Sequence, residues 1–215
     1  MSVTIRNAQA EDAPFLAKVM LMASRSQLPR GLWDQFVNGS EEQCLSFLRN
    51  LAVTRTPHLF HHDVFIIAEK DGQAAAGLSG YDPETEGMPF FAKALPEVLG
   101  GLGWSMADLK AASKRMSSFG RCSPDDGPGV WVVESVAAMP EARGQGLVSL
   151  LLDEILAQGR AKGYDKAQIG VFTGNAPAIR VYEKAGFRYV DEKRDPEFES
   201  TYGDFGIARL MMDLR

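Results

Sequence analysis

The sequence has little of several features that would mark other classes of protein. Two cysteines, Cys44 and Cys122, occur among 215 residues, so neither a disulfide framework nor a cysteine-based metal cluster is indicated, and a reducing compartment is expected. Acidic residues outnumber basic ones by 28 to 23, which gives a net charge of -5 and does not favour nucleic-acid binding. No apolar run has the length of a membrane span. We therefore predict a cytoplasmic protein that contacts neither nucleic acid nor membrane.

The length and composition fit one globular unit. Hydrophobic residues make up 45% of the chain and charged residues 24%, an ordinary balance for a soluble fold. A chain of this size buries one sizeable core. We predict a single domain over residues 1–215.

The most informative stretch begins with the apolar segment Val130–Ala138, which predicts a strand that ends before Pro140. A glycine-rich turn follows at residues 143–146, and from Leu147 apolar residues recur at helical spacing. A strand, a glycine turn and a helix N-terminus direct unpaired backbone N–H groups at one point, which predicts an anion site. A tight connection without a ligand is the alternative. No Gly-Lys-Ser/Thr sequence follows, which argues against a P-loop.

Two motifs in order carry a resemblance to a known family. The first runs from Glu134 to Leu147, and the second follows some thirty residues later as Asn-Ala-Pro-Ala-Ile-Arg-Val-Tyr-Glu-Lys-Ala-Gly-Phe over residues 175–187. Together they resemble the GCN5-related N-acetyltransferase (GNAT) family. The family's phosphate motif, Arg/Gln-x-x-Gly-x-Gly/Ala, falls on Arg143, Gly146 and Val148, with valine where a small residue is usual. The strong match covers roughly the C-terminal third of the chain.

The resemblance implies an α/β fold in which a mixed, mostly antiparallel sheet is flanked by helices and has a splayed parallel strand pair at its centre. The gap between these strands would receive the pantetheine of acetyl-CoA, and the glycine turn its diphosphate. Asn175 also suits the N-cap of a helix. The residues expected to bind the coenzyme are Val136, Ala137, Ala138, Arg143, Gly144, Gln145, Gly146, Leu147, Val148, Asn175 and Tyr182.

The same resemblance implies an N-acetyltransferase that moves an acetyl group from acetyl-CoA to a primary amine of a small molecule or peptide by direct transfer. Tyr182 would be the general acid and Glu134 the base, directly or through water; a core tyrosine and a structural carboxylate are the alternatives. A backbone N–H near Ser135 or Val136 would stabilise the oxyanion. A noncatalytic acyl-CoA-binding sensor and a protein-modifying acetyltransferase are the alternative functions. A homodimer is a further expectation, since dimers are common in the family.

Three histidines, His58, His61 and His62, precede a strand. Their spacing invites interpretation as a metal site, but Pro57 and the strand that follows argue against a helix that would bring two of them onto one face. We predict a solvated loop and no metal.

Several further segments give expectations. Asp63–Lys70 and Gln73–Tyr81 are expected to form a hairpin around an Asp-Gly turn. Residues 82–129 are expected to be a partly helical insertion, with helices at 89–99 and 106–119, that covers the acceptor pocket or forms a dimer contact. Candidates for a wall of the acceptor site, with core packing the favoured role, are Trp33, Asp34 and Phe36. The acidic residues between positions 195 and 204 would border the acceptor opening in the family and could attract a cationic amine, but a solvated loop is the favoured interpretation.

Overall fold

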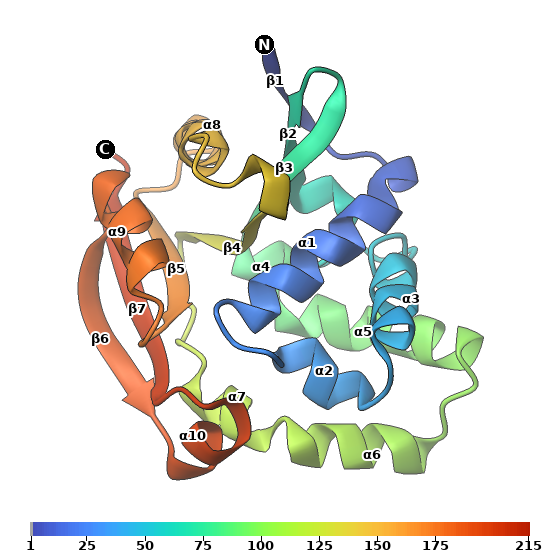
Figure 1. Ribbon diagram of the computed structural model, residues 1–215. Helices are drawn as coiled ribbons and strands as arrows, with labels where there is room; N and C mark the ends of the chain where they lie inside the picture. Colours follow the sequence, from blue (N-terminus) through green and yellow to red (C-terminus); the bar gives the residue numbers. More distant parts are fainter. Residues whose placement is uncertain (1) are drawn as a thin grey trace.

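The computed structural model describes residues 2–215, which form a seven-stranded sheet with helices on both faces (Figure 1). The strand order is β1-β2-β3-β4-β5-β7-β6. Neighbouring strands are antiparallel except for β4 and β5, which are parallel. The predicted mixed, mostly antiparallel sheet is thus confirmed. The strands are β1 (Val3–Asn7), β2 (Phe65–Lys70), β3 (Gln73–Tyr81), β4 (Val130–Ala138), β5 (Lys166–Phe172), β6 (Arg188–Arg194) and β7 (Gly206–Asp213).

Ten α-helices and three short 3-10 segments connect the strands of the described chain. The N-terminal helices are α1 (Ala13–Arg25), α2 (Leu32–Val37) and α3 (Glu41–Leu51). Residues 82–129, expected as a partly helical insertion, contain α4 (Pro83–Glu86), α5 (Met88–Gly101), α6 (Met106–Arg115) and α7 (Ser117–Cys122). The C-terminal helices are α8 (Leu147–Ala161), α9 (Ala176–Lys184) and α10 (Pro196–Tyr202). The 3-10 segments are η1 (Ala10–Asp12), η2 (His62–Val64) and η3 (Pro140–Ala142).

The two faces of β4 lie in different hydrophobic cores. Val130 and Val132 belong to the core that contains side chains of α1, α3 and α5. Trp131 and Val133 belong to the core that contains side chains of α8 and α9. Because side chains alternate along a strand, this pattern assigns Glu134 to the face covered by α1 and α5. Figure 1 shows these two groups of helices on opposite sides of the central strands.

Two local features agree with the sequence. The β2–β3 hairpin turns at Asp71 and Gly72, which both have positive φ (50° and 80°), as a two-residue primed turn requires. Helix α3 begins with a capping box in which the Ser40 hydroxyl accepts the N–H of Gln43. Along residues 2–215, no helix combines the length and apolarity needed to cross a bilayer.

Gly80 on β3 allows α8 to pack closely on the sheet. A Cβ atom at this position would lie 2.4 Å from Ile155 Cγ1 and 2.9 Å from Trp131 Cζ2. We expect Gly80→Ala to lower the free energy of unfolding by about 1–3 kcal/mol, because α8 must shift to admit the methyl group. Urea denaturation measures the change. Gly100→Ala is the control: no atom lies within 4 Å of its Cβ position, and alanine in α5 should raise stability by up to about 1 kcal/mol. An unchanged stability for Gly80→Ala would contradict this packing.

Candidate functional site

The parallel strands β4 and β5 pair along only part of their length. Their register runs from Val130 opposite Lys166 to Val133 opposite Ile169 and then stops. Residues 134–138 of β4 and 170–172 of β5 continue without pairing to each other. Each strand remains paired on its other side, β4 to β3 and β5 to β7. The predicted splay is therefore present, and it leaves two strand edges with backbone groups facing each other across a gap.

A β-bulge distorts β4 beside this gap. Gly77 of β3 is opposite Ala137, and Ser79 is opposite Glu134, so two residues of β4, Ser135 and Val136, face one residue of β3. Ser135 has a φ of 53°, an uncommon value for a residue other than glycine. An extra residue in a bulge leaves ladder groups unpaired. The bulge thus coincides with the position, near Ser135 or Val136, at which a free backbone N–H is expected.

The turn between β4 and α8 presents a row of unpaired donors. Gly144 and Gly146 have φ values of 72° and 79°, which reverse the chain into the first turn of α8. The first hydrogen bond of the helix is donated by Leu150 to the Gly146 carbonyl. Within residues 2–215, the six backbone N–H groups of residues 144–149 donate to no protein acceptor. A row of free N–H groups at a helix N-terminus is suited to an anion such as a diphosphate.

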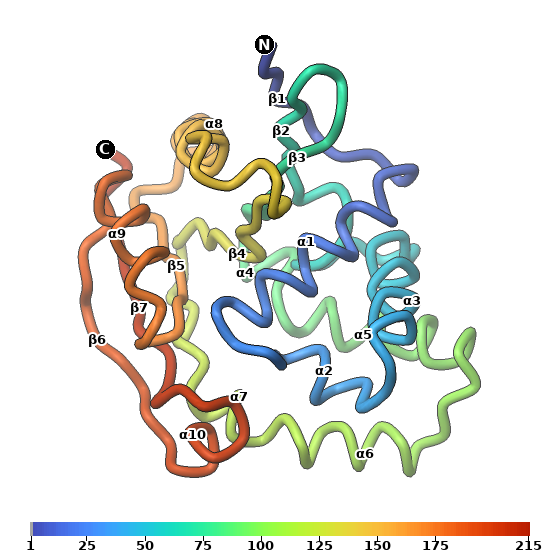
Figure 2. Tube along the Cα trace, viewed as in Figure 1, coloured from blue at the N-terminus to red at the C-terminus, as the bar shows by residue number. Residues whose placement is uncertain are grey.

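Side chains hold the turn against the neighbouring hairpin. Gln145 donates from Nε2 to the Glu141 carbonyl (2.8 Å) and accepts at Oε1 from Lys70 Nζ (2.6 Å). Lys70 is the last residue of β2, and Figure 2 shows the turn before α8 beside the β2–β3 hairpin. Arg143 bonds back to the Ala138 carbonyl (3.4 Å). The Lys70 ammonium group therefore lies beside the turn that contains the free N–H groups. No pattern in the sequence indicated Lys70.

Leu147 and Val148 contribute backbone rather than side chains to this row. The Leu147 side chain is buried in the core beneath α8, and Val148 is partly buried against the same core. Valine in place of the usual small residue therefore directs its bulk toward the protein, and its N–H group stays free.

Helix α9, which follows β5 in the chain, has two of the expected residues, Asn175 at its N-cap and Tyr182 within it. The Asn175 carboxamide caps the helix by accepting the N–H of Ala178 (3.2 Å) and donates to the Ser26 hydroxyl (2.5 Å). Asn175 therefore has the N-cap role that its sequence position suggests. Tyr182 is buried, packs edge-on against Phe187 and belongs to the core of the α8 face. Its hydroxyl makes no hydrogen bond to any described residue, and burial raises its pKa, so the group is protonated at neutral pH.

Glu134 lies on the opposite face of the sheet, among polar groups from three other segments. Burial raises the pKa of this carboxyl to about 7, and the negative charge of Asp126 adds to the increase, whereas the Tyr81 hydroxyl lowers it. Desolvation disfavours the charged carboxylate, and a like charge nearby does the same. A carboxyl that titrates near neutrality can take a proton from an amine at physiological pH. Tyr182 and Glu134 therefore lie on opposite faces of the sheet.

Three residues near Glu134 were missed in the sequence. Tyr81 ends β3, Gln168 lies within β5, and Asp126 precedes β4 in the turn that closes the insertion. Gln168 donates from Nε2 to Asp126 Oδ1 (3.0 Å). Tyr81 and Gln168 are both opposite Val132 in the strand register, so their side chains lie on the same face as that of Val132. No spacing in the sequence connects either residue with Asp126.

The prediction of a solvated histidine loop is wrong. His58 is fully buried, where its Nδ1 accepts the Phe60 N–H and its Nε2 lies 3.1 Å from the Thr54 hydroxyl. His61 is also buried. Burial lowers the pKa of both imidazoles, which favours their neutral forms.

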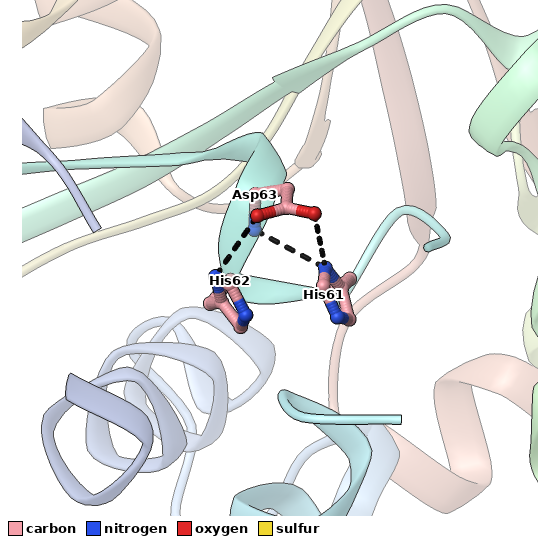
Figure 3. A group of neighbouring side chains, drawn as sticks. All are labelled: His61, His62 and Asp63. Carbon is pink, nitrogen blue, oxygen red and sulfur yellow. Dashed lines mark hydrogen bonds and ion pairs between the residues drawn. The ribbon is translucent and has the colours of Figure 1, made fainter. Parts of the chain in front are cut away.

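His61, His62 and Asp63 lie together, and Figure 3 shows both imidazoles turned toward the carboxylate. Their candidate ligand atoms lie within 4.8 Å of one another. However, His61 Nδ1 already accepts the Asp63 N–H (3.3 Å) and so caps η2. A metal ion would have to replace that bond, because neutral imidazole has a single free lone pair. We assign this group a capping role.

The acidic segment between positions 195 and 204 forms neither a solvated loop nor an unpaired acidic border. This segment contains α10, with Asp195 as its N-cap. Asp195 and Glu197 both pair with Arg121 (2.6 Å each). Asp204 is buried and accepts from the Thr173 hydroxyl (2.6 Å). These three charges are satisfied internally, which leaves Glu199 as the one acidic residue of the segment that is exposed and forms no ion pair with a described residue.

The candidate wall residues of the N-terminal segment have the core role that the sequence analysis favoured. Trp33 and Phe36 are buried in an aromatic cluster with Phe47. Asp34 is buried and receives a two-point contact from the Arg25 guanidinium at 2.9 and 2.8 Å. All three residues lie within α2.

Comparison with known proteins agrees with this geometry. The family model described as "Acetyltransferase (GNAT) family" matches residues 31–187. A crystal structure described as that of an acetyltransferase has a TM-score of 0.71 at 21% identity, covering 99% of this chain and 100% of that one. An N-acetyltransferase from Staphylococcus aureus Mu50 has a TM-score of 0.67 at 16% identity, covering 97% of this chain and 100% of that one.

A putative acetyltransferase from Salmonella typhimurium, solved with its cofactor acetyl-CoA, has a TM-score of 0.53 at 14% identity, covering 100% of this chain and 95% of that one. At these identities the solved structures show the shared fold. Comparison with curated protein sequences gives no match. The family match extends over most of the sequence and includes the splayed strands and the turn with free N–H groups. From this match we conclude that the chain belongs to the GNAT family of acetyltransferases, which use acetyl-CoA.

Proposed function

We propose that this protein is an N-acetyltransferase that moves the acetyl group of acetyl-CoA directly to a primary amine of a small molecule or peptide. The observation that carries the proposal is the gap between β4 and β5, with six free N–H groups at residues 144–149 beside it. Tyr182 and Glu134 lie on opposite faces of the sheet, and we assign them to the two sides of this gap. The arrangement contains an anion site, an acid and a base, which are the parts that acyl transfer to an amine requires.

The coenzyme-binding part consists mainly of backbone. The N–H groups of residues 144–149 would hold the diphosphate, and the free edge of β4 at Val136, Ala137 and Ala138 would pair with pantetheine amides like an added strand. Arg143 and Gln145 shape the turn through the bonds described above. Asn175 fixes the start of α9 and hence the position of Tyr182. When bound, acetyl-CoA supplies an activated thioester carbonyl.

The remaining groups of the site act on protons and on developing charge. Glu134, with a pKa near 7, accepts a proton from the incoming amine directly or through water. A backbone N–H at the Ser135–Val136 bulge, where the register with β3 shifts, would donate to the carbonyl oxygen as it gains negative charge. Tyr182, whose hydroxyl is protonated and has no described protein partner, donates its proton to the departing thiolate sulfur. These steps need no metal. A cytoplasmic location and a homodimer stay predictions.

A thiol-release assay tests the proposal. Purified protein is mixed with acetyl-CoA and each member of a panel of primary amines, and free coenzyme thiol is measured together with the mass of the product. We expect amine-dependent thiol release and a product heavier by one acetyl group. A protein that binds coenzyme A but releases no thiol with any amine would instead be a sensor. Acetylation seen only with intact protein substrates would indicate a protein-modifying enzyme.

Lys70 provides a test of the anion site. We expect Lys70→Ala to weaken coenzyme A binding by about 3- to 10-fold, because the variant loses an exposed cation beside the free N–H groups. Calorimetric titration at low and high salt measures the effect, which should shrink as salt increases. Lys110→Ala, an exposed change on α6, is the control. An equal loss of coenzyme A affinity in both variants would show that Lys70 is not part of the anion site.

A further inference from the structure

The connection between α1 and α2 begins with a turn in which serine occupies a position that glycine normally takes. Ser26 has a φ of 55° and a ψ of -118°, and the Leu28 N–H donates to the Arg25 carbonyl (2.8 Å). These values match the first central residue of a type II′ turn, where a Cβ atom is disfavoured. A residue other than glycine in this backbone region destabilises the fold. The presence of a side chain at Ser26 therefore needs a separate explanation.

The Ser26 side chain joins this turn to the start of α9. Its hydroxyl accepts a hydrogen bond from Asn175 Nδ2 (2.5 Å) and donates to Gln27 Oε1 (2.5 Å). Asn175 uses its other amide atom, Oδ1, to cap α9 at the Ala178 N–H. One serine hydroxyl thus connects positions that are 149 residues apart in the chain. Glycine, the residue that this backbone conformation favours, could not make the connection.

Gln27 attaches the same turn to the end of β5. Its Nε2 donates to Asp204 Oδ2 (2.9 Å). The buried Asp204 carboxylate also accepts from the Thr173 hydroxyl (2.6 Å) and the Gly174 N–H (3.0 Å), which directly follow β5. Leu28 packs against the hydrophobic cluster formed by α7, α10 and the ends of β5 and β7. Three consecutive residues of the turn therefore contact the C-terminal part of the protein.

The turn lies between the two splayed strands at their unpaired end. Helix α1, which precedes it, packs in the core that contains Val130 and Val132 of β4. The partners of the turn at residues 173–175 instead follow the unpaired part of β5 at residues 170–172. Figure 1 shows the connection after α1 extending toward α9. The turn therefore links the β4 side of the gap to the β5 side where the two strands no longer pair.

The same link bears on the position of Tyr182. This residue lies seven positions after Asn175, which is about two helical turns along α9 and on nearly the same side of the helix. Fixing the N-terminus of α9 therefore fixes where the Tyr182 hydroxyl lies relative to the gap. A displacement of about 1 Å at a reacting group can lower a rate by about 100-fold.

We propose that Ser26 is a positioning residue for acetyl transfer: through Asn175 and α9 it fixes the Tyr182 hydroxyl at the gap. Gln27 is the second point of attachment of the same turn. This inference rests on the proposed function and adds a residue that acts through the proposed acid. The unfavourable backbone conformation is retained because the hydroxyl is needed. Backbone stability favours glycine at position 26, whereas the position of the acid requires serine, so the two effects can be separated by substitution.

The test begins with Ser26→Gly and Ser26→Ala, which both remove the hydroxyl. With acetyl-CoA and the best amine of the panel, we expect both variants to lose about 10- to 100-fold in kcat. The glycine variant should have the higher thermal midpoint, because alanine keeps a Cβ atom in the unfavourable conformation. Coenzyme A affinity should change by less than about threefold, because the N–H groups of residues 144–149 hold the diphosphate. Asn38→Gly, at another residue with positive φ (51°), is the control and should keep the wild-type kcat.

A double-mutant cycle with Tyr182→Phe tests whether Ser26 acts through the tyrosine. In the Tyr182→Phe background, Ser26→Gly should lower kcat by less than about twofold, since no hydroxyl remains to be positioned. Gln27→Ala is an exposed change that serves if the Ser26 variants do not fold. It should lower kcat by about 3- to 10-fold in the wild-type background and by less than about twofold with Tyr182→Phe.

The possible failures are distinguishable. An unchanged kcat in Ser26→Gly, an equal loss in Asn38→Gly, or the same fold-loss with and without Tyr182→Phe would overturn the positioning role and leave acetyl transfer intact. Full turnover by Tyr182→Phe alone would do the same. A wild type that binds coenzyme A but releases no thiol with any amine would overturn acetyl transfer, and with it the role of Ser26.

Discussion

Replacing Tyr182 by phenylalanine is expected to lower kcat by at least about 100-fold, the range seen when a positioned general acid is lost. The hydroxyl is buried, has no hydrogen-bond partner among the described residues, and has a raised pKa, so it holds a proton at neutral pH. Phenylalanine keeps the ring that packs against Phe187. Coenzyme A affinity and the thermal midpoint should therefore change little, and the loss should appear in kcat from the thiol assay.

Tyr202→Phe is the matched control for this change. Tyr202 is equally buried, and its hydroxyl lies 3.9 Å from the Met116 sulfur in a different core cluster. Removing that hydroxyl should leave kcat unchanged. If Tyr182→Phe keeps full turnover with a good acceptor, the tyrosine is only a core residue and the proton for the thiolate comes from elsewhere.

The second large effect is expected for Glu134→Gln. In the wild type, kcat should rise as the pH increases through about 7, because the carboxyl must lose its proton before it can accept one from the amine. The glutamine variant should lack this rise and have a kcat lower by about 100-fold at pH 8. Rate measurements from pH 5.5 to 9 test both points. Glu154→Gln, an exposed change on α8, should keep the wild-type profile. A variant with the same pH profile as the wild type would show that Glu134 is a bystander.

The stability of Glu134→Gln separates chemistry from folding. The pKa of Glu134 is raised in the folded protein from 4.5 to about 7, so the folded state holds this proton more tightly than the unfolded state. The wild type should therefore lose stability as the pH rises from about 4.5 through 7. Glutamine removes that loss, and the free energy of unfolding at pH 8 should increase by up to about 3 kcal/mol. A variant that is inactive and more stable has lost a chemical group rather than its fold.

The parts of the site that lie within one continuous segment could be predicted from the sequence. The strand, turn and helix over residues 130–161 depend on local signals: an apolar run, two glycines and helical periodicity. The capping role of Asn175 is also local, because its side chain bonds three residues ahead. The hairpin at Asp71 and Gly72 has the same explanation.

The sequence alone could not show which face of the sheet Glu134 occupies. Alternation fixes relative faces within a strand, but only the cores on each side determine which helices cover each face. The bulge at Ser135 then changes the alternation for the rest of β4, and no glycine marks it in the sequence. The partnership of Asp126 with Gln168 joins positions 42 residues apart, through a parallel register that no local pattern encodes.

The wrong predictions have a similar origin. Histidine-rich segments are usually exposed, yet His58 is covered by Phe60 and Phe91 and bonded to Thr54. The acidic residues after position 194 suggested a free rim because their partner, Arg121, lies 74 residues before Asp195. In both cases the deciding contact comes from another element.

The central claim is that the gap between β4 and β5 and the N–H groups beside it hold coenzyme A. A crystal structure of the complex with coenzyme A tests this most directly. We predict the diphosphate within hydrogen-bond distance of the N–H groups of residues 144–149 and the pantetheine between residues 134–138 and 170–172. A complex in which side chains fill that gap and the coenzyme lies elsewhere would contradict the claim.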